Sequence, residues 1–540
     1  MFSIDQNCHS LWDALPKLHA LASHGHAVTH FIEDIDVAFA ALGASVDDAV
    51  LHLARERFHR SGGQDWGAAL FYADFLGKLP VEIRHWEPLT GLKTKTLARQ
   101  LGRSVDDLYD AFSPGDTWQL IGSSYIGDRD HHRVIGDLSV RETRDFVLDL
   151  LSRAEADMLG AFPDTASQAR LREWLAAERE RLNHLLAECA TAGLVDLYRA
   201  WMGGHLYAHD VDLALTSSLF ATGGDPARVA LLDVFVADYE RASSLYNEAL
   251  AETDADLRAL AISDGELPFF AIQEFQGHLV RTAAYLDGRE VRFGHQTFRL
   301  TDDGRLPVHE LTEGGIRCLA GKAILLVTQA RIGPAGQPLA LPHRGSLYMP
   351  SANRLVSKLA AERLLPGTLK PIVRVRFRLL DRMRGLDTVI RLPEHLAASF
   401  GKAEIPAREL GECHERLAAE AAARLDQLLD PASRARWQKE QFPVLAERIA
   451  GLEGERRDMA QRNCTPEQMS DIWKACKAAQ VELLDATVRQ IARDYQLRNL
   501  DYWDSRGALL PWCIALGGRE FYDHVVAQAE VYEEPLPSDA

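Results

Sequence analysis

Three arginines at alternate positions are the residues of this sequence best suited to binding an anion. Arg374, Arg376 and Arg378 alternate with apolar residues across 372–379, and alternate side chains point to the same face of a β-strand. Each planar guanidinium group donates two parallel hydrogen bonds to a phosphate or a carboxylate. Segment 354–391 holds ten Lys and Arg against three Asp and Glu, a local charge of +7 (10 − 3) in a chain of formal net charge −18. The pattern predicts a site where an anion docks.

Polar donors directly precede this strand. Segment 342–354 offers hydroxyl, imidazole, amide and guanidinium groups, and Gly345 lets the backbone approach a bound group closely. We expect a substrate or cofactor site here, built with the three arginines. An alternative stays open, in which the arginines form salt bridges with the acidic helical region further along and bind no ligand. The predicted donors of this segment are His343, Arg344, Ser346, Tyr348, Asn353 and Arg354.

A second polar cluster lies in 122–137. Asp128, Asp130, His131 and His132 fall within five residues, and a carboxylate that orients a histidine is the usual arrangement for acid–base catalysis near neutral pH. These four are the predicted catalytic residues. The alternative is a polar surface turn whose acidic and basic side chains pair with one another.

A third cluster, of histidine and aspartate residues, could bind a metal ion. His205 and His209 would share one face of a helix at a spacing of i, i+4, with Asp210 as a further ligand of a divalent metal. A purely structural pair of histidines is the alternative. The sequence defines no cofactor; a nucleotide and a divalent metal are the two candidates.

Two common signatures are missing. In 314–323 five residues separate Gly315 from Gly321, and Ala323 stands where a phosphate-binding loop of the Walker type needs a hydroxyl. The sequence also contains no Gly-x-Ser-x-Gly nucleophile turn. These observations disfavour P-loop nucleotide hydrolases and serine hydrolases of the nucleophile-elbow type.

The elements that must hold these residues change in type along the chain. Helical periodicity dominates up to about 112, for example in 46–58 and 67–79, and 113–137 reads as a long structured loop. Helices resume over 139–262, short β-like runs alternate with turns over 263–400, and long helices return over 401–500. We expect a predominantly α protein with a central mixed α/β domain and a long antiparallel helical arm near the C-terminus. The predicted regions are 1–138, 139–262, 263–400, 401–500 and 501–540.

Several helix boundaries have local signals. Asp225 and Asp430 each stand before a proline, as helix N-caps do, and Thr465 with Gln468 fits a capping box. Phe442-Pro443 predicts a kink or break between two helical segments.

Composition bounds the compartment and the partners. The chain has 540 residues, 47% hydrophobic and 26% charged, as in ordinary globular proteins. Its seven cysteines form no Cys-x-x-Cys pair, and no signal peptide or apolar run of 18 residues is found. We expect a cytoplasmic protein without a membrane span. Acidity outside 354–391, close to −25 (−18 − 7), opposes binding of duplex nucleic acid.

The tetrapeptide Leu364-Leu365-Pro366-Gly367 and the helical arm at about 407–500 resemble the cysteine ligase of bacillithiol synthesis. In that family the tetrapeptide lies near the active-site region and the arm is a coiled coil. Segment 118–137 also resembles one from an uncharacterised bacterial family, which implies no function. The glycine- and glutamine-containing nucleotide motif of the ligase family is not found in the N-terminal half.

We therefore expect a cytoplasmic enzyme that binds a small anion, such as a phosphorylated metabolite, nucleotide or carboxylate, for group transfer or ligation. A homodimer through the helical arm is the expected assembly. Two alternatives remain: a helical scaffold that docks an acidic partner through the arginines, and a metal-dependent enzyme centred on His205 and His209.

Overall fold

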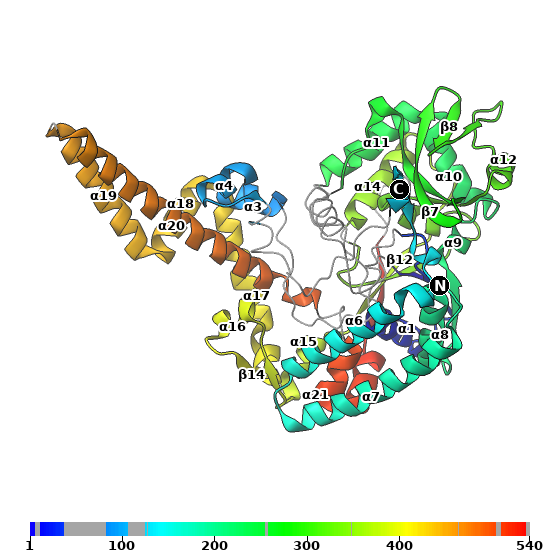
Figure 1. The fold of residues 1–540 in the computed structure, drawn as a ribbon, viewed down its shortest axis with the longest axis horizontal. Coiled ribbons are helices and arrows are strands. Elements are labelled where there is room, and N and C mark those ends of the chain that lie inside the picture. The colour runs from blue at the N-terminus through cyan, green and yellow to red at the C-terminus, as the bar shows by residue number, and fades with distance from the viewer. Residues whose placement is uncertain are drawn as a thin grey trace. The chain divides into compact units, whose positions relative to one another are not determined.

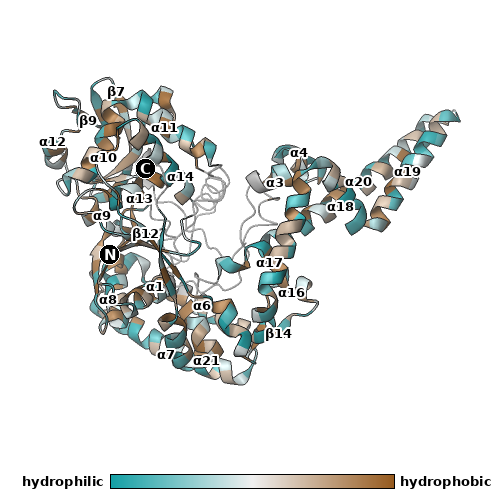
Figure 2. Cartoon of the chain, turned by 180° about the vertical axis from the view of Figure 1, so that it is seen from behind, coloured by the Kyte–Doolittle hydropathy of each residue, from teal (hydrophilic) through white to brown (hydrophobic). Residues whose placement is uncertain are grey.

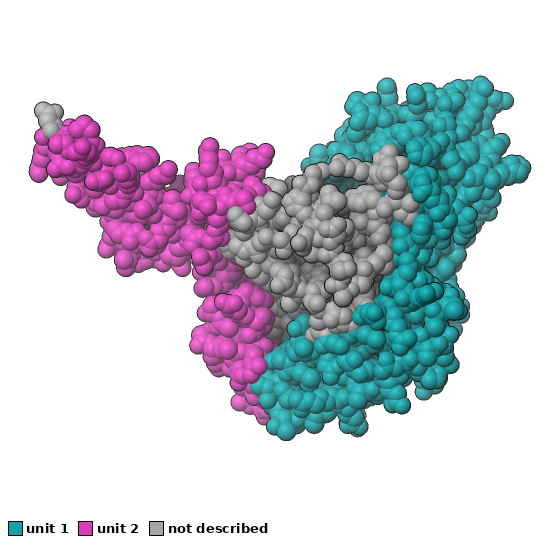
Figure 3. All heavy atoms as spheres, viewed as in Figure 1, with its two compact units in different colours: residues 1–75, 118–382, 502–540 teal, residues 76–117, 383–501 magenta. Residues whose placement is uncertain are grey.

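The chain forms two compact units in a computed structural model, which describes residues 1–5, 11–36, 83–105, 108, 125–126, 128–253, 257–346, 348–462, 464–503 and 509–535. Unit 1 combines 1–75, 118–382 and 502–540, and unit 2 combines 76–117 and 383–501 (Figure 3). Both units are thus built from distant parts of the sequence. The five contiguous regions that the sequence suggested do not coincide with them.

Unit 1 contains a six-stranded sheet in the order β15-β12-β11-β1-β2-β5. All of its strands are parallel except β15, which pairs antiparallel with β12. Numbered along the chain, the spatial order from the other edge is 3-2-1-4-5-6, the order of the Rossmann-type doubly wound sheet. The strands are β1 (Phe2–Ile4), β2 (Val28–Ile32), β5 (Val211–Leu215), β11 (Leu339–Pro342), β12 (Ile372–Arg376) and β15 (Glu530–Glu534).

Helices cover both faces of this sheet. In Figure 1, α14 (Met349–Ala361) lies above β12 and α1 (Leu11–Ser23) below it. Ile4 and Phe31 pack into one apolar core with α14 and with α13 (Ile324–Arg331). Side chains one position away from these two face α1, because successive residues of a strand point to opposite faces. Buried apolar residues of unit 1 lie on both sides of the sheet, since Leu15 and Leu18 of α1 are buried as well.

A second sheet of unit 1 is antiparallel and has the order β10-β6-β7-β4-β3, with β8 and β9 continuing from β7. Core residues of β6, such as Phe269 and Ala271, join the same apolar core as the first sheet. The strands are β3 (Tyr125–Ile126), β4 (Asp128–Arg133), β6 (Glu266–Phe275), β7 (His278–Asp287), β8 (Glu290–Phe293), β9 (Gln296–Arg299) and β10 (Ile316–Gly321).

Further helices complete unit 1. The side chain of Arg170 on α7 donates to the carbonyl oxygens of Ile514, Ala515 and Leu516 on α21, just before the helix kinks at Gly518 (φ +79°). The remaining helices are α6 (Val140–Ala161), α7 (Thr165–Glu188), α8 (Leu194–Leu206), α9 (Thr216–Leu219), α10 (Pro226–Ala237), α11 (Tyr239–Glu252), α12 (Val308–Glu313), α15 (Leu379–Arg382) and α21 (Leu509–Ala527).

Unit 2 is largely helical. Arg448 of α19 pairs with Glu482 of α20, and Glu453 accepts from Gln480 at 3.2 Å, so the two helices run antiparallel. Figure 2 shows hydrophilic and hydrophobic residues mixed along α17, whose buried residues Ala421, Leu425 and Leu428 recur every three or four positions, as an amphipathic helix requires. The elements are α3 (Ile83–Thr90), α4 (Thr94–Gln100), α16 (Glu394–Phe400), α17 (Ala407–Leu429), α18 (Pro431–Gln441), α19 (Pro443–Gln461), α20 (Pro466–Arg498) and the strand pair β13 (Val389–Arg391) and β14 (Glu404–Pro406).

The mixed α/β character that the sequence predicted is confirmed. The interpretation of 113–137 as a loop is wrong in its described part, since 125–126 and 128–133 are strands of the second sheet. The predicted helical stretches 46–58 and 67–79 lie outside the described residues. Among the described residues, no helix is both long and apolar enough to span a membrane.

Candidate site at the carboxyl edge of the parallel sheet

The five parallel strands of the first sheet end at one edge, and the strand order reverses between β1 and β11. Ligands of doubly wound sheets bind outside the carboxyl ends of the strands at such a reversal. The predicted donor segment follows β11 directly, because β11 ends at Pro342 and α14 begins at Met349. Residues chosen for their chemistry thus lie at the position that the topology favours for a ligand.

The backbone of this turn is unusual at two positions. A Cβ on Gly345 would lie 2.7 Å from Cδ of Pro342, so the turn needs glycine there. Ser346 has φ +58°, a left-handed conformation that costs a non-glycine residue about 1 kcal/mol. Its hydroxyl is buried and has no hydrogen-bond partner among the described residues. A buried unsatisfied hydroxyl next to a strained backbone indicates a functional position.

The first turn of α14 contacts the backbone of Ser346. The Met349 amide donates to the Ser346 carbonyl oxygen at 3.1 Å, and Pro350 occupies the first turn of the helix. A helix N-terminus carries partial positive charge and attracts anions. Ser346 and α14 together therefore suit a phosphate or carboxylate group.

Arg374 stabilises the turn between β11 and α14. Its Nη1 donates to the carbonyl oxygens of Gly345 at 2.7 Å and Pro342 at 3.1 Å, while its Nε contacts Glu534 of β15 at 2.6 Å. The side chain is 9% exposed. Arg374 thus fixes the loop that carries Ser346, a role that the sequence did not suggest.

The other two arginines of the strand differ from each other. Arg376 is the last residue of β12, at the carboxyl edge of the sheet. Arg378 lies beyond the strand at φ +52° and contacts Glu530 of β15 at 2.5 Å, so the expected strand 372–379 is too long. Salt bridges do form, as the alternative interpretation held, but those of Arg374 and Arg378 join acidic residues of the same sheet.

The remaining predicted donors lie on both sides of the turn. Nδ1 of His343 is 2.7 Å from the hydroxyl of Tyr532, and Arg344 and Tyr348 are partly exposed. Arg354 is exposed and pairs with Glu252 of α11, while Asn353 on the next position of α14 is partly buried. The structure thus gathers 343–346, Tyr348 and Arg376 at the carboxyl edge and directs Arg354 to a helix–helix salt bridge.

The predicted acid–base residues lie on the second sheet. His131 is 1% exposed, stacks on Phe275 at 3.9 Å between ring centroids, and lies 5.2 Å from the ring of His295. His132 is partly buried in the same strand, whereas the side chains of Asp128 and Asp130 lie outside the described residues. This packing favours a structural role for His131.

The helical spacing behind the predicted metal site is wrong. Helix α8 ends at Leu206, so His209 and Asp210 lie in the turn after it. His205 Nε2 contacts Glu178 at 3.0 Å, and His209 stacks beside His19 with ring centroids 4.6 Å apart. Among the described residues these side chains do not gather their ligand atoms around one ion position.

Sequence reasoning missed the carboxylates that follow β2. Glu33 Oε1 accepts from the amides of Ile35 at 2.8 Å and Asp36 at 2.9 Å. Asp34 accepts from the amide and the hydroxyl of Ser217 at 2.8 and 2.5 Å. Burial raises the pKa of Glu33 and of Asp34, and for Glu33 the charges of Asp36 and Asp34 add to the effect. In the sequence, the signal that could have identified these carboxylates is a group of acidic residues directly after an apolar run.

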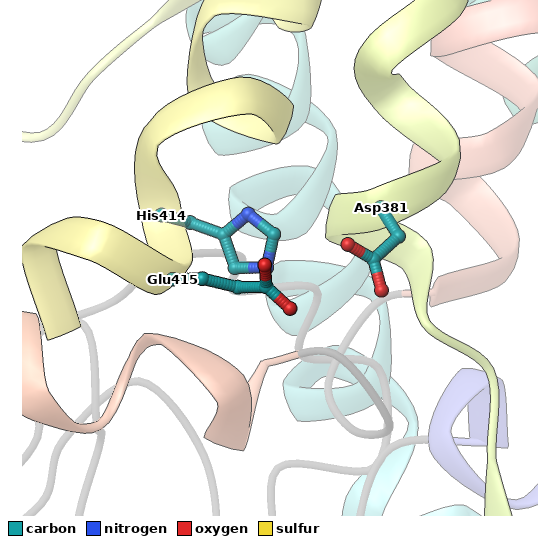
Figure 4. Close-up of side chains that lie close together, drawn as sticks. All are labelled: Asp381, His414 and Glu415. Atoms are coloured by element: carbon teal, nitrogen blue, oxygen red, sulfur yellow. The ribbon is translucent and has the colours of Figure 1, made fainter. Parts of the chain in front are cut away.

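A histidine and a carboxylate also adjoin each other in unit 2. His414 and Glu415 project from neighbouring positions of α17 (Figure 4), where Asp381, also drawn, belongs to α15 of unit 1. His414 Nδ1 donates to the carbonyl oxygen of Gly411 at 3.0 Å. Protein metal sites usually supply three ligands or more, and within unit 2 this pair supplies two.

No protein-family model and no curated protein matches the sequence of this chain.

Proposed function

We propose that the protein is an enzyme that binds a small anionic substrate at the carboxyl edge of its parallel sheet, for group transfer or ligation. The phosphate or carboxylate of a metabolite or nucleotide would accept hydrogen bonds from Ser346 and the first turn of α14, with Arg376 adding charge. The observation that carries this proposal is the buried, unsatisfied hydroxyl of Ser346 at the strand-order reversal.

Ligation is the reaction that the sequence resemblance favours. Leu364 and Leu365 of the tetrapeptide pack against the core that α13 and α14 share, in the connection from α14 to β12. The tetrapeptide therefore belongs to the βαβ unit that carries Ser346. A cytoplasmic location and a homodimer through α17–α20 are parts of the same proposal.

The scaffold alternative requires arginines that are available to an acidic partner. Arg374 and Arg378 already contact Glu534 and Glu530, so the small-molecule site is the better supported of the two. A stoichiometric metal in the purified protein would instead favour the metal-dependent alternative.

The first test is native mass spectrometry of the gently purified protein, with metal analysis of the same sample. A retained small anion supports the proposal and names its chemical class. The second test is calorimetric titration with inorganic phosphate, ADP and citrate. Ser346→Ala should weaken the tightest of these about 10- to 100-fold, the effect of one hydrogen bond to a charged group.

The matched control for this titration is Ser357→Ala, on the same helix, whose hydroxyl already donates to the Asn353 carbonyl oxygen at 3.1 Å. Arg376→Ala should also weaken binding without unfolding the protein. Unchanged affinity in Ser346→Ala, or no binding of any of the three anions to the wild type, would overturn the proposed site.

A further inference from the structure

Lys322 lies in segment 314–323, which the proposed site does not use. It follows the last residue of β10, and its amide donates to the carbonyl oxygen of Pro268 at 2.8 Å. Its side chain is 23% exposed, and its ammonium group lies 2.8 Å from Oε1 of Glu266, which is 4% exposed. The next residue, Ala323, has φ +38°, a strained backbone conformation for a residue with a side chain. Lys322 is thus a partly buried cation beside a buried carboxylate.

The ammonium group of Lys322 has more donors than Glu266 can accept. It carries three N–H donors, and among the described residues Glu266 is its one acceptor. The same Oε1 also accepts from Arg258, and Oε2 accepts from the amide of Ala261 at 2.9 Å. Two cations therefore share one carboxylate, and donors of Lys322 stay unused.

Arg281 on β7 brings a further cation to this place. Its guanidinium group lies over the ring of Phe270, 3.7 Å from the centroid, and Phe270 is two residues from Pro268, which contacts Lys322. Its Nη1 donates to Oδ1 of Asp36 at 2.8 Å, which is its one hydrogen bond among the described residues. Because a guanidinium group has five N–H donors, Arg281 can bind a second acceptor.

Arg281 lies close enough to Lys322 to affect its charge. Burial lowers the pKa of Lys322, the ion pair with Glu266 opposes this shift, and the charges of Arg281 and Arg258 reinforce it. Like charges that are held together and partly removed from water are unfavourable unless an anion compensates them. The charges around Lys322 are thus two cations and one carboxylate, so a further anion would be stabilised there.

Two contacts place this pair of cations at the carboxyl edge of the parallel sheet. Asp36, the partner of Arg281, lies just beyond the end of β2. Helix α13 begins two residues after Lys322 and ends at Arg331, whose carbonyl oxygen accepts from the amide of Lys370, shortly before β12 begins. The end of α13 therefore lies at the amino edge of the sheet, and its beginning points to the carboxyl edge.

We propose that Lys322 and Arg281 form a second anion-binding site, which takes a phosphate or carboxylate group. The ammonium and guanidinium groups donate to its oxygens in addition to the bonds that they make with Glu266 and Asp36. The site is separate from the Ser346 turn and does not depend on the proposed function. In an enzyme that joins two anionic substrates, it would hold the second one.

Acetylation of amines measures whether an anion binds at Lys322. The neutral amine is the reactive form, and a bound anion covers it and favours its charged form. The full-length protein is acetylated briefly with increasing phosphate or citrate, and mass spectrometry quantifies the modification of each lysine. Saturating anion should slow the reaction of Lys322 about 10-fold or more, the effect of one pKa unit.

Two controls accompany this measurement. Sodium chloride at equal ionic strength corrects for screening of charges. Lys358 on α14 is the internal control, because its ammonium group also lies in ion pairs, with Glu248 at 2.8 Å and Glu252 at 2.7 Å. Its reaction rate should not depend on the anion.

Two substitutions of Arg281 form a matched pair, since Arg281→Lys keeps the positive charge and Arg281→Met removes it. The anion concentration that halves the acetylation of Lys322 should rise about 10-fold or more in Arg281→Met and clearly less in Arg281→Lys. This concentration is compared between variants, because the charge of Arg281 also acts on the reactivity of Lys322 without any anion.

Each possible failure has a distinct meaning. If no anion slows the acetylation of Lys322 more than chloride does, or if Lys358 is slowed equally, the inference is overturned. Protection that is unchanged in Arg281→Met would show that the two cations share no anion. Protection that disappears in Ser346→Ala would assign the anion to the Ser346 turn and exclude a second site. Protection that survives in Ser346→Ala supports the second site, even if the proposed function fails its own titration.

Discussion

Ser346 combines two features that lower stability, a left-handed backbone and a buried hydroxyl without a described partner. Glycine adopts a positive φ without a steric penalty. Ser346→Gly should therefore raise the free energy of unfolding by about 1 kcal/mol, while Ser346→Ala keeps the backbone strain and gains less. Urea denaturation of the three proteins measures the difference. A Ser346→Gly variant no more stable than Ser346→Ala would show that the turn is not strained.

His19 links the stability of unit 1 to pH. The Tyr522 hydroxyl lies 2.6 Å from its Nδ1, and its Nε2 lies 3.2 Å from the His205 carbonyl oxygen. Burial lowers the pKa of His19 to about 3, and the nearby charges of His209, Arg519 and His205 act in the same direction. The folded protein thus holds this ring neutral at pH values where an unfolded chain protonates it.

The sign of the effect follows from the two pKa values. In the unfolded chain His19 takes up a proton below about pH 6.5, and in the folded protein only near pH 3. Its contribution to stability is therefore complete above pH 6.5 and decreases as the pH falls, by about 2 kcal/mol at pH 5. Urea denaturation between pH 7 and pH 5 should show a flatter profile for His19→Gln than for the wild type.

The control for this profile is His309→Gln, which replaces a histidine whose side chain is 80% exposed. Its profile should follow that of the wild type. Equal slopes for His19→Gln and the wild type would show that the buried ring does not resist protonation.

Single residues of the candidate site were predictable where chemistry alone identifies them. The donors 343–346 stood out because polar, cationic and glycine residues cluster before an arginine-rich strand. The contact between Asp5 and His30 could not be predicted in this way, since it comes from strand pairing across 24 intervening residues and not from local spacing. The bracing role of Arg374 also depends on a distant partner, Glu534.

At the scale of elements, Arg374 joins three segments: the turn after β11, β12 itself and β15. Arg374→Gln removes a buried ion pair and leaves the Gly345 and Pro342 carbonyl oxygens with fewer donors, so it should destabilise the protein by about 2–4 kcal/mol. Arg378→Gln removes a more exposed pair and should cost less than about 1 kcal/mol. Equal losses in urea denaturation would contradict the bracing role.

The N-terminus of helix α20 carries a capping signal that the sequence predicted. The side chain of Thr465 accepts from the Gln468 amide, and Gln468 accepts from the Thr465 amide at 3.1 Å, which confirms the predicted capping box. Thr465→Ala should lower the stability of unit 2 by about 1 kcal/mol, whereas Thr465→Ser should leave it nearly unchanged. Thermal denaturation followed by circular dichroism provides the measurement.

The elements that were predicted correctly carry such local signals. The N-caps Asp225 and Asp430 and the break at Phe442-Pro443 all lie where the sequence placed them. The strands of the parallel sheet were missed over 1–112 because β1 and β2 are short and buried on both faces, so they lack the alternation of a half-buried strand. Strand β4 was missed for the opposite reason, since Asp128–Arg133 is polar throughout.

At the scale of the whole molecule, each unit has a core of its own. Leu425 and Trp437 are buried in a cluster formed entirely by unit 2, and Leu232 and Phe235 in one formed entirely by unit 1. Sequence analysis could not find this division, because unit 2 combines 76–117 with 383–501 and its closure depends on contacts between residues far apart in the chain.

Separate cores predict separate unfolding. Leu425→Ala and Leu232→Ala each remove a fully buried side chain and should destabilise their own unit by about 2–5 kcal/mol. Differential scanning calorimetry should resolve two transitions, of which Leu425→Ala lowers one and Leu232→Ala the other, since a cavity in one core leaves the contacts of the other intact. The parallel sheet and Ser346 belong to unit 1, so anion binding should survive in Leu425→Ala between the two melting temperatures. A single transition that both variants lower equally would mean that the two units unfold as one.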